Sequence, residues 1–439
     1  MRERERPLFN IPFGIAFAQS APMNKTLGIL AATLLIACGS NVNGGEGGAG
    51  GAAGQAGSSG SGGAGGFAGD PDPGGDAGSD GETRFGLNDV SILFPVPEAS
   101  GDGLYRATDM GGYGELLPLS VFQTVGPIAR KGCVNSGVAG CEKTEEVATT
   151  HPRLRVVAVR IDPCFPALGG STCRSQVRFV MQPIDKGSFD DDALHVFYDL
   201  PKEEFDTLVR ELGKISRSVQ KDLPLGVHPL LGQQGTQGAY AKALKTALFS
   251  HIGASRISRV TALEMTFIAG GWSFRGFEFD HGASPTPIGI VGSTEQKQGI
   301  QGFGSIAPPT PVFPEDAPFS LFWDADQLEQ ASDGERQAAY DDALVIENPT
   351  KKTVDQESCA ACHTALPMRI MAEKTFDLKS TGNANAFTSS FDLARTSKPQ
   401  LSEQQNMLHA FSYHGVDAGI SQRTINESAA VAEYLNGSN

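Results

Sequence analysis

Positive charge is scarce in this sequence. Its 439 residues include 35 lysines and arginines against 50 aspartates and glutamates, which gives a formal net charge of −15. A chain this acidic has no broad electrostatic reason to bind nucleic acid or an anionic lipid surface, because both already carry negative charge. We therefore expect no nucleic-acid partner.

Several common catalytic signatures are also absent. The sequence contains no phosphate-binding loop, no HExxH zinc motif and no Gly-x-Ser-x-Gly nucleophile motif. His195, in a strand-like segment, and His251, near the end of a helix-like segment, are expected to be structural or surface histidines. The three adjacent aspartates at 190–192 are expected to form a solvated turn. No catalytic residue is predicted.

The sequence near the N-terminus has no apolar run long enough to cross a bilayer. MNKTLGILAATLLIACGS starts at Met23, carries Lys25, and continues with an apolar run of about ten residues, the size found in signal peptides. The run ends in Leu-Ile-Ala followed by Cys38, which resembles the lipobox of bacterial lipoproteins. This resemblance implies that residues 23–37 are a cleaved signal peptide and that Cys38 is lipidated.

The segment from Met23 to Cys38 also predicts the cellular location of the protein and the start of its translation. We expect an exported protein held on a membrane by its lipid, with residues 1–22 lying before the true start of translation. Gly39, rather than an aspartate, follows the lipidated cysteine, which favours the outer membrane. Residues 38–83 are rich in glycine and cannot bury a core, so they are predicted to form a flexible tether.

Residues 84–340 are predicted to form a strand-rich α+β domain whose ligand the sequence does not specify. The segments at 153–161 and 176–184 alternate apolar with polar residues, as half-buried strands do. The segments at 201–215 and 240–253 have helical periodicity and favourable ends. The domain therefore combines a sheet with a few helices.

Four cysteines lie in this region, in two short glycine-rich loops. Cys133 is close to Cys141, and Cys164 is close to Cys173. Because an exported protein meets an oxidising compartment, we predict a local disulfide within each pair. Crossed pairing between the two loops remains open.

The last two cysteines belong to ESCAACHTALP, in which Cys359, Cys362 and His363 form a CxxCH motif. Two thiols about one helical turn apart can each add to a vinyl group of haem, and the adjacent imidazole can bind the iron. A redox-active disulfide, a structural zinc site and a plain disulfide are the alternatives; no second CxxC supplies further zinc ligands. The motif resembles the attachment site of c-type cytochromes, which implies one covalent haem c.

Residues 341–439 have the size of a small cytochrome domain. Ile425, Ala429, Ala432 and Leu435 line one face of a final helix. Class I-like cytochromes c end in such a helix, packed on the helix that carries CxxCH. This resemblance implies a small all-α C-terminal domain beside the α+β domain.

The distal iron ligand cannot be assigned from a Met-Pro loop, because the sequence shows none in the usual place. Met407 is the first candidate and His414 the second. His409, two methionines just after the motif (Met368 and Met371) and an open site follow.

We therefore expect a lipid-anchored c-type haem protein that exchanges electrons with a redox partner protein or a small donor or acceptor. One alternative is a two-domain haem oxidoreductase or peroxidase-like enzyme. Another is a surface binding module with a redox accessory domain.

Overall fold

The computed structural model describes residues 84–96, 102–125, 147–164, 174–185, 187–217, 219–266, 271–280, 285–291, 293, 296–300, 308–353, 356–380, 384–394 and 408–437. All of them belong to one compact unit, which spans Ala77–Asn439. Cys38, Cys133, Cys141, Cys173 and Met407 lie outside the described residues, as do the predicted signal peptide and the whole of the predicted tether.

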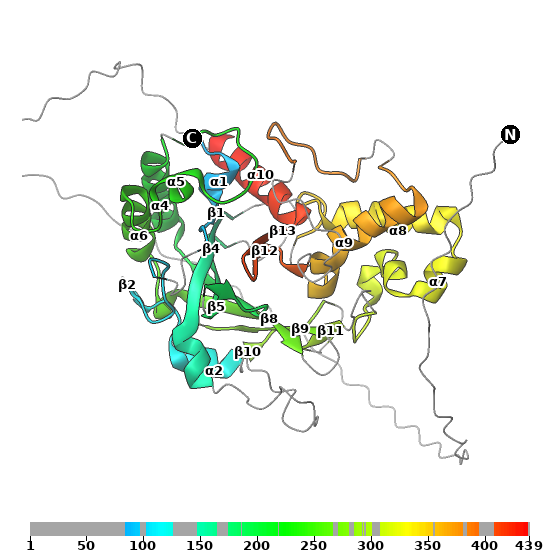
Figure 1. Ribbon diagram of the computed structural model, residues 1–439, viewed down its shortest axis with the longest axis horizontal. Helices are drawn as coiled ribbons and strands as arrows, with labels where there is room; N and C mark the ends of the chain where they lie inside the picture. Colours follow the sequence, from blue (N-terminus) through cyan, green and yellow to red (C-terminus); the bar gives the residue numbers. More distant parts are fainter. Residues whose placement is uncertain are drawn as a thin grey trace, which may run out of the picture. The chain divides into compact units, whose positions relative to one another are not determined.

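A nine-stranded antiparallel sheet forms the centre of this unit (Figure 1). Its main path runs β1-β4-β5-β7-β8-β9-β10, with β6 paired to β5 and β11 paired to β9. The strands are β1 (Ser91–Leu93), β4 (Leu154–Asp162), β5 (Gln176–Asp185), β6 (Ser188–Phe189), β7 (Ala193–Asp199), β8 (Ile257–Thr266), β9 (Gly271–Glu278), β10 (Thr286–Pro287) and β11 (Gln298–Ile300). The strands expected at 153–161 and 176–184 are β4 and β5, which pair with each other.

Helices gather at both ends of the sheet in Figure 1. The first group is α4 (Lys202–Ile215), α5 (Pro229–Gln234) and α6 (Ala239–Phe249), and the second is α7 (Ala325–Gln330), α8 (Asp333–Ile346) and α9 (Cys359–Phe376). α10 (Gln422–Gly437) lies near α1 (Leu87–Val90), and α2 (Leu119–Val125) and α3 (Val147–Thr150) complete the described α-helices. Two small hairpins are β2 (Met110–Gly111) with β3 (Gly114–Glu115), and β12 (Phe411–His414) with β13 (Asp417–Ile420).

The helix ends follow their local sequences. α4 begins after Pro201 with acidic residues in its first turn, where the helix dipole favours them, and its buried face includes Phe205 and Leu208. α8 has a capping box between Ser332 and Glu335. None of the helices in the described ranges combines the length and apolar character that a bilayer span needs.

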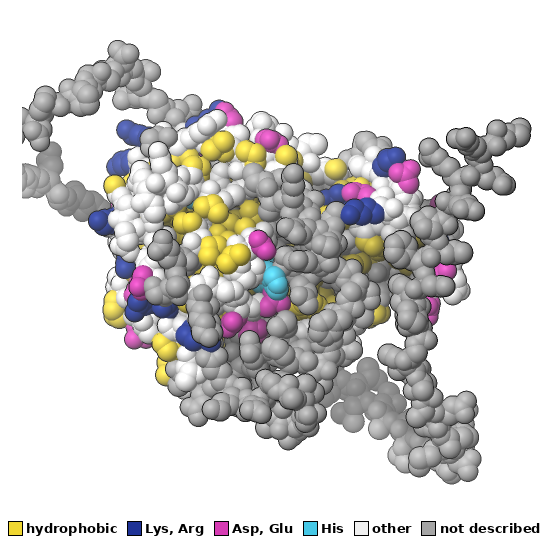
Figure 2. All heavy atoms as spheres, in the orientation of Figure 1, with side chains coloured by type: hydrophobic (Ala, Val, Ile, Leu, Met, Phe, Trp, Pro, Cys, Tyr) yellow, Lys and Arg dark blue, Asp and Glu magenta, His cyan; other side chains and the backbone are white. Residues whose placement is uncertain are grey.

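The surface carries mixed charge on the face drawn in Figure 2. Lysine and arginine side chains lie among aspartate and glutamate side chains, and a histidine is exposed next to acidic groups. The expectation that nucleic acid is not a partner stays a prediction.

The prediction of a small all-α C-terminal domain is wrong. The apolar face of α10, including Ile425 and Ala429, packs into the main core of the large sheet, as do Phe411 and Tyr413 of the β12–β13 hairpin. Five buried residues of α9 belong instead to a second core, which includes Trp272 of β9 and Trp323; they are Ala360, Ala361, Ala365, Met368 and Ala372. Helical periodicity shows which face of a helix is buried, but it does not identify the partner that covers this face.

Candidate functional site

The CxxCH motif forms the first turn of α9, the longest described helix. Ser358 is its N-cap, and the hydroxyl oxygen accepts a hydrogen bond from the backbone N–H of Ala361 at 3.1 Å. The same hydroxyl donates to the buried carboxylate of Asp316 at 2.8 Å. A capped first turn is well ordered, because helix N-termini otherwise leave backbone N–H groups without partners. The motif is thus held on a fixed part of the fold.

Both motif cysteines are free thiols that line one cavity. They are three residues apart, so they project from the same side of α9. Burial raises the pKa of Cys359 to about 11 and raises the pKa of Cys362 well above its usual value. Both groups are therefore neutral thiols at neutral pH. A redox-active CxxC pair depends on a lowered cysteine pKa, so this setting disfavours that alternative.

His363 is oriented by a backbone hydrogen bond. Its Nδ1–H donates to the carbonyl oxygen of Leu408 at 2.5 Å, and its ring packs 4.8 Å from the ring of Phe274. Because a carbonyl can only accept, the proton of the neutral imidazole lies on Nδ1. Burial lowers the pKa of His363 to about 4, so the ring is neutral at neutral pH. Nε2 makes no hydrogen bond to the described residues and keeps a lone pair that can bind metal.

The cavity has a volume of about 510 Å³ and lies between the sheet, α9 and α10. This volume falls in the range of roughly 300–1,000 Å³ typical of cofactor and ligand pockets. Apolar walls include Val180 of β5, Phe197 of β7 and Ile290. A smaller cavity of about 40 Å³ is lined by some of the same residues, including Cys359 and His363.

Five arginines line the larger cavity: Arg160, Arg178, Arg259, Arg275 and Arg423. Each forms an ion pair with a carboxylate, and those carboxylates are Asp162, Glu264, Glu278 and Glu427. The Nε atoms of Arg160 and Arg178 are buried and have no hydrogen-bond acceptor within the described ranges. These two atoms have almost no accessible surface, so only the cationic guanidinium groups that line the cavity make it suited to an anionic ligand.

Glu357, the residue two before Cys359, also lines this cavity. Burial raises its pKa to about 8, although Arg423 lies 3.6 Å away and acts in the opposite direction. Its carboxyl group is therefore mostly protonated at pH 7. The five arginines face four charged carboxylates, which leaves the surroundings of the cavity net positive.

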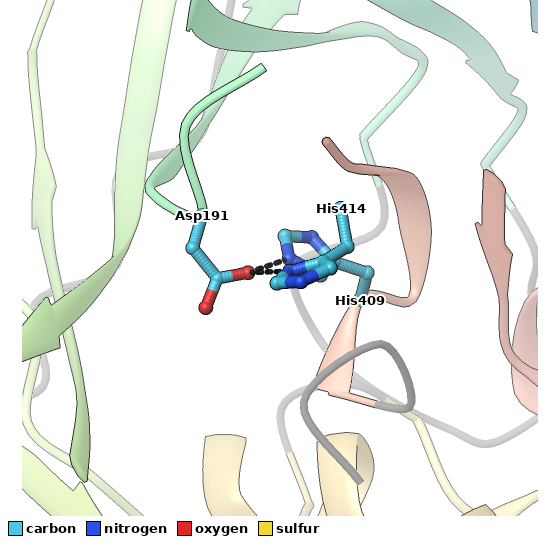
Figure 3. A group of neighbouring side chains, drawn as sticks. All are labelled: Asp191, His409 and His414. Carbon is cyan, nitrogen blue, oxygen red and sulfur yellow. Dashed lines mark hydrogen bonds and ion pairs between the residues drawn. The ribbon is translucent and has the colours of Figure 1, made fainter. Parts of the chain in front are cut away.

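A second group of polar side chains joins β12 to the loop before β7 (Figure 3). Asp191 Oδ1 accepts hydrogen bonds from His409 Nε2 at 2.5 Å and from His414 Nδ1 at 2.9 Å. Burial alone would raise the pKa of Asp191, but these two histidines lower it well below its usual value. Trp272 donates to the other oxygen, and Ser412 bonds Nδ1 of His409.

The three donor atoms of Asp191, His409 and His414 lie within 4.8 Å of one another, so the group has a composition that could hold a metal ion. Both histidines nevertheless bond Asp191 Oδ1 directly, and His409 is satisfied at both ring nitrogens. The arrangement acts as a support: it anchors His409, the neighbour of Leu408, whose carbonyl orients His363. His414, predicted as an alternative distal ligand, does not line either cavity.

The predicted disulfides are described only at Cys164. This residue is disulfide-bonded, and the other two described cysteines are free thiols. Its partner therefore lies outside the described residues, and pairing with Cys173 stays a prediction. The pairing of Cys133 with Cys141, the lipid on Cys38 and the ligand role of Met407 concern residues outside the described ranges.

His195 lies at the site, although the sequence predicts no site role for it. It was expected to be a structural or surface histidine, yet it lines both cavities together with His363 and Cys359. Burial, with help from the nearby Arg178 and His363, lowers its pKa well below the usual value. The alternation of β7 places His195 on the same side as Phe197, which was a usable signal, but which side faces a cavity could not be read from the strand.

Comparison with known proteins adds no family to this picture. No protein-family model, no curated protein and no solved structure matches the chain.

Proposed function

We propose that this protein is an exported c-type haem protein that transfers electrons, with its haem held in the cavity beside Cys359, Cys362 and His363. The observation that carries the proposal is a coincidence of three features. The two thiols and the imidazole of one CxxCH motif face a single cavity of about 510 Å³, and the nitrogen of His363 that could bind iron makes no other bond to the described residues. A chance CxxCH sequence requires none of these features.

Each residue of the motif has a distinct task. The thiols of Cys359 and Cys362 would each add across a vinyl double bond, forming one S–C and one C–H bond, with nothing released. His363 would supply Nε2 to the iron, with its ring held by the carbonyl of Leu408. The bound group supplies one-electron exchange between ferric and ferrous iron. The chain keeps this group in place and surrounds it with apolar walls.

The arginines suit the acidic side of such a group. Haem carries two carboxylate substituents, which would accept charge-assisted hydrogen bonds from the guanidinium groups that line the cavity, those of Arg160 and Arg178 among them. Charge-assisted hydrogen bonds of this kind are stronger than neutral ones. We therefore assign the arginines to binding and orientation of the carboxylates.

We also propose that the mature chain is anchored by lipid on Cys38, most consistent with an outer-membrane location, and exchanges electrons with a partner at that surface. The lipobox-like sequence and the glycine-rich segment after it support this proposal. A Cys38→Ala variant should leave the membrane fraction, as measured by fractionation and intact mass. Unchanged membrane association would contradict the anchor.

The function is tested by expressing the full chain in bacteria that carry the c-type cytochrome maturation system. A sharp α-band in the reduced-minus-oxidised spectrum, together with pigment that resists acid–acetone extraction, is expected. Cys359→Ala combined with Cys362→Ala should abolish covalent pigment. Lys374→Ala, an exposed change on the same helix, is the matched control and should retain it. A colourless protein, or pigment removed by acid–acetone, would overturn the proposal.

A further inference from the structure

We infer that His195 is the second axial ligand of the haem iron. This inference rests on the proposed function and extends it, since it assigns the iron a ligand from the central sheet, more than 150 residues before the attachment motif. The resemblance to class I cytochromes implies a ligand after the motif. The geometry points to β7 instead.

His195 stands on a rigid part of the molecule. β7 lies inside the sheet, where His195 pairs with Val180 of β5 on one side and Thr261 of β8 on the other. All three residues line the larger cavity, so this part of the sheet forms a wall of it. A ligand on such a strand is held more closely than one on a loop, because both neighbouring strands restrain its backbone.

The imidazole of His195 has no polar partner in the part of the chain that the structure describes. Its ring packs near the ring of Phe197, with the two centroids 6.3 Å apart. Polar groups that leave water usually gain a hydrogen bond, since an unpaired one costs free energy. A half-buried imidazole that faces a cavity without such a bond is therefore suited to a bound group.

The other side chains around the two cavities that could bind iron already have another role or another partner. The nitrogen- and sulfur-bearing candidates for binding haem there are Cys359, Cys362, His363, His195 and His409. The cysteines serve attachment and His363 serves as the proximal ligand. His409 is excluded, because Asp191 and Ser412 occupy both of its ring nitrogens. Within the described residues this leaves His195.

Coordination by two imidazoles has clear consequences. Iron with two strong nitrogen ligands is six-coordinate and low-spin, and it has no open position for oxygen or peroxide. A histidine pair also gives a lower reduction potential than a histidine–methionine pair. Such a site favours electron transfer over peroxidase-like catalysis.

The decisive experiment compares haem attachment with haem coordination in the full-length, haem-loaded protein. His195→Ala should keep the covalent haem, measured by intact mass and by the pyridine haemochrome of the unfolded chain. It should lose the low-spin spectrum in both oxidation states, bind carbon monoxide readily, and recover the low-spin spectrum when imidazole is added. His251→Ala, a histidine change away from both cavities, is the matched control and should keep the low-spin spectrum.

The outcomes separate the two proposals. If His195→Ala carries covalent haem and remains low-spin, or if Met407→Ala is the variant that becomes high-spin, the assignment of His195 is wrong while the proposed function stands. If the unaltered protein carries no covalent haem, both are wrong. Should His195→Ala fail to fold, the near-infrared magnetic circular dichroism of the unaltered ferric protein decides: a bis-imidazole band supports His195, and a methionine-type band overturns it.

Discussion

The imidazole of His363 donates from Nδ1 to the backbone carbonyl of Leu408, a residue 45 positions further along the chain. The next residue, His409, is fixed by Asp191, which comes from the loop before β7. Three distant segments therefore cooperate to orient one ring. Such outer partners commonly set the orientation and basicity of a metal-binding histidine.

Replacing Asp191 with asparagine tests this support. The change keeps the shape but removes the charge that accepts hydrogen bonds from His409 and His414. Hydrogen bonds to charged groups contribute about 1.5–3 kcal/mol each, so we expect the free energy of unfolding to fall by about 2–3 kcal/mol. Denaturant titration measures it. Asp417→Asn, an exposed change in the β12–β13 hairpin that carries His414, should change the free energy of unfolding by no more than about 0.5 kcal/mol. An equal loss in both variants would argue against the support.

Glu427 tests the arginine cluster. This buried carboxylate bonds Arg160 at 2.7 Å and Arg423 at 2.6 Å. Burial by itself would raise its pKa, but Arg423 and Arg160 lower the pKa well below its usual range. Glu427→Gln leaves two buried guanidinium groups without this charge, and we expect a loss of about 3–5 kcal/mol in the free energy of unfolding.

The control for Glu427 is Glu329→Gln, an exposed substitution on α7. Its unfolding transition should match that of the unaltered protein. If Glu427→Gln also unfolds at the same denaturant concentration as the unaltered protein, the cluster does not depend on this carboxylate for stability.

His228 predicts a pH dependence of stability. It is fully buried, stacks on Tyr240 with the ring centroids 4.3 Å apart, and neither ring nitrogen has a hydrogen-bond partner in the described ranges. Burial, assisted by Lys221, lowers its pKa to about 3. The unfolded chain, with a histidine pKa of about 6.5, therefore binds one proton more than the folded chain between these two values.

This difference in proton binding makes the folded protein less stable in acid. As the pH falls from about 6.5 towards 3, this histidine lowers the free energy of unfolding by about 1.4 kcal/mol per pH unit, and above pH 6.5 it has no pH-dependent effect. His228→Phe removes the titration and keeps a ring against Tyr240. Denaturant titrations across this range should show the difference between the two proteins changing with that slope. Parallel curves would show that His228 titrates normally in the folded protein.

Short-range sequence patterns specify the local chemistry of the motif. Ser358, the two alanines and the spacing of Cys359, Cys362 and His363 specify a capped helical turn with two thiols and an imidazole, whatever surrounds it. The alternation at 153–161 and 176–184 likewise specified β4 and β5, because strand periodicity depends only on neighbouring residues. Local rules act within a few residues, and these elements obey them.

Long-range packing sets which side chains surround the motif. α10 packs on the sheet rather than closing a separate all-α domain around α9, because its small apolar face fits the main core. The carbonyl of Leu408, the side chains of Arg160 and Arg178, and the imidazole of His195 reach the site from strands and loops far away in the chain. Their arrival depends on strand order and on the packing of helices against the sheet, and no short-range pattern encodes either.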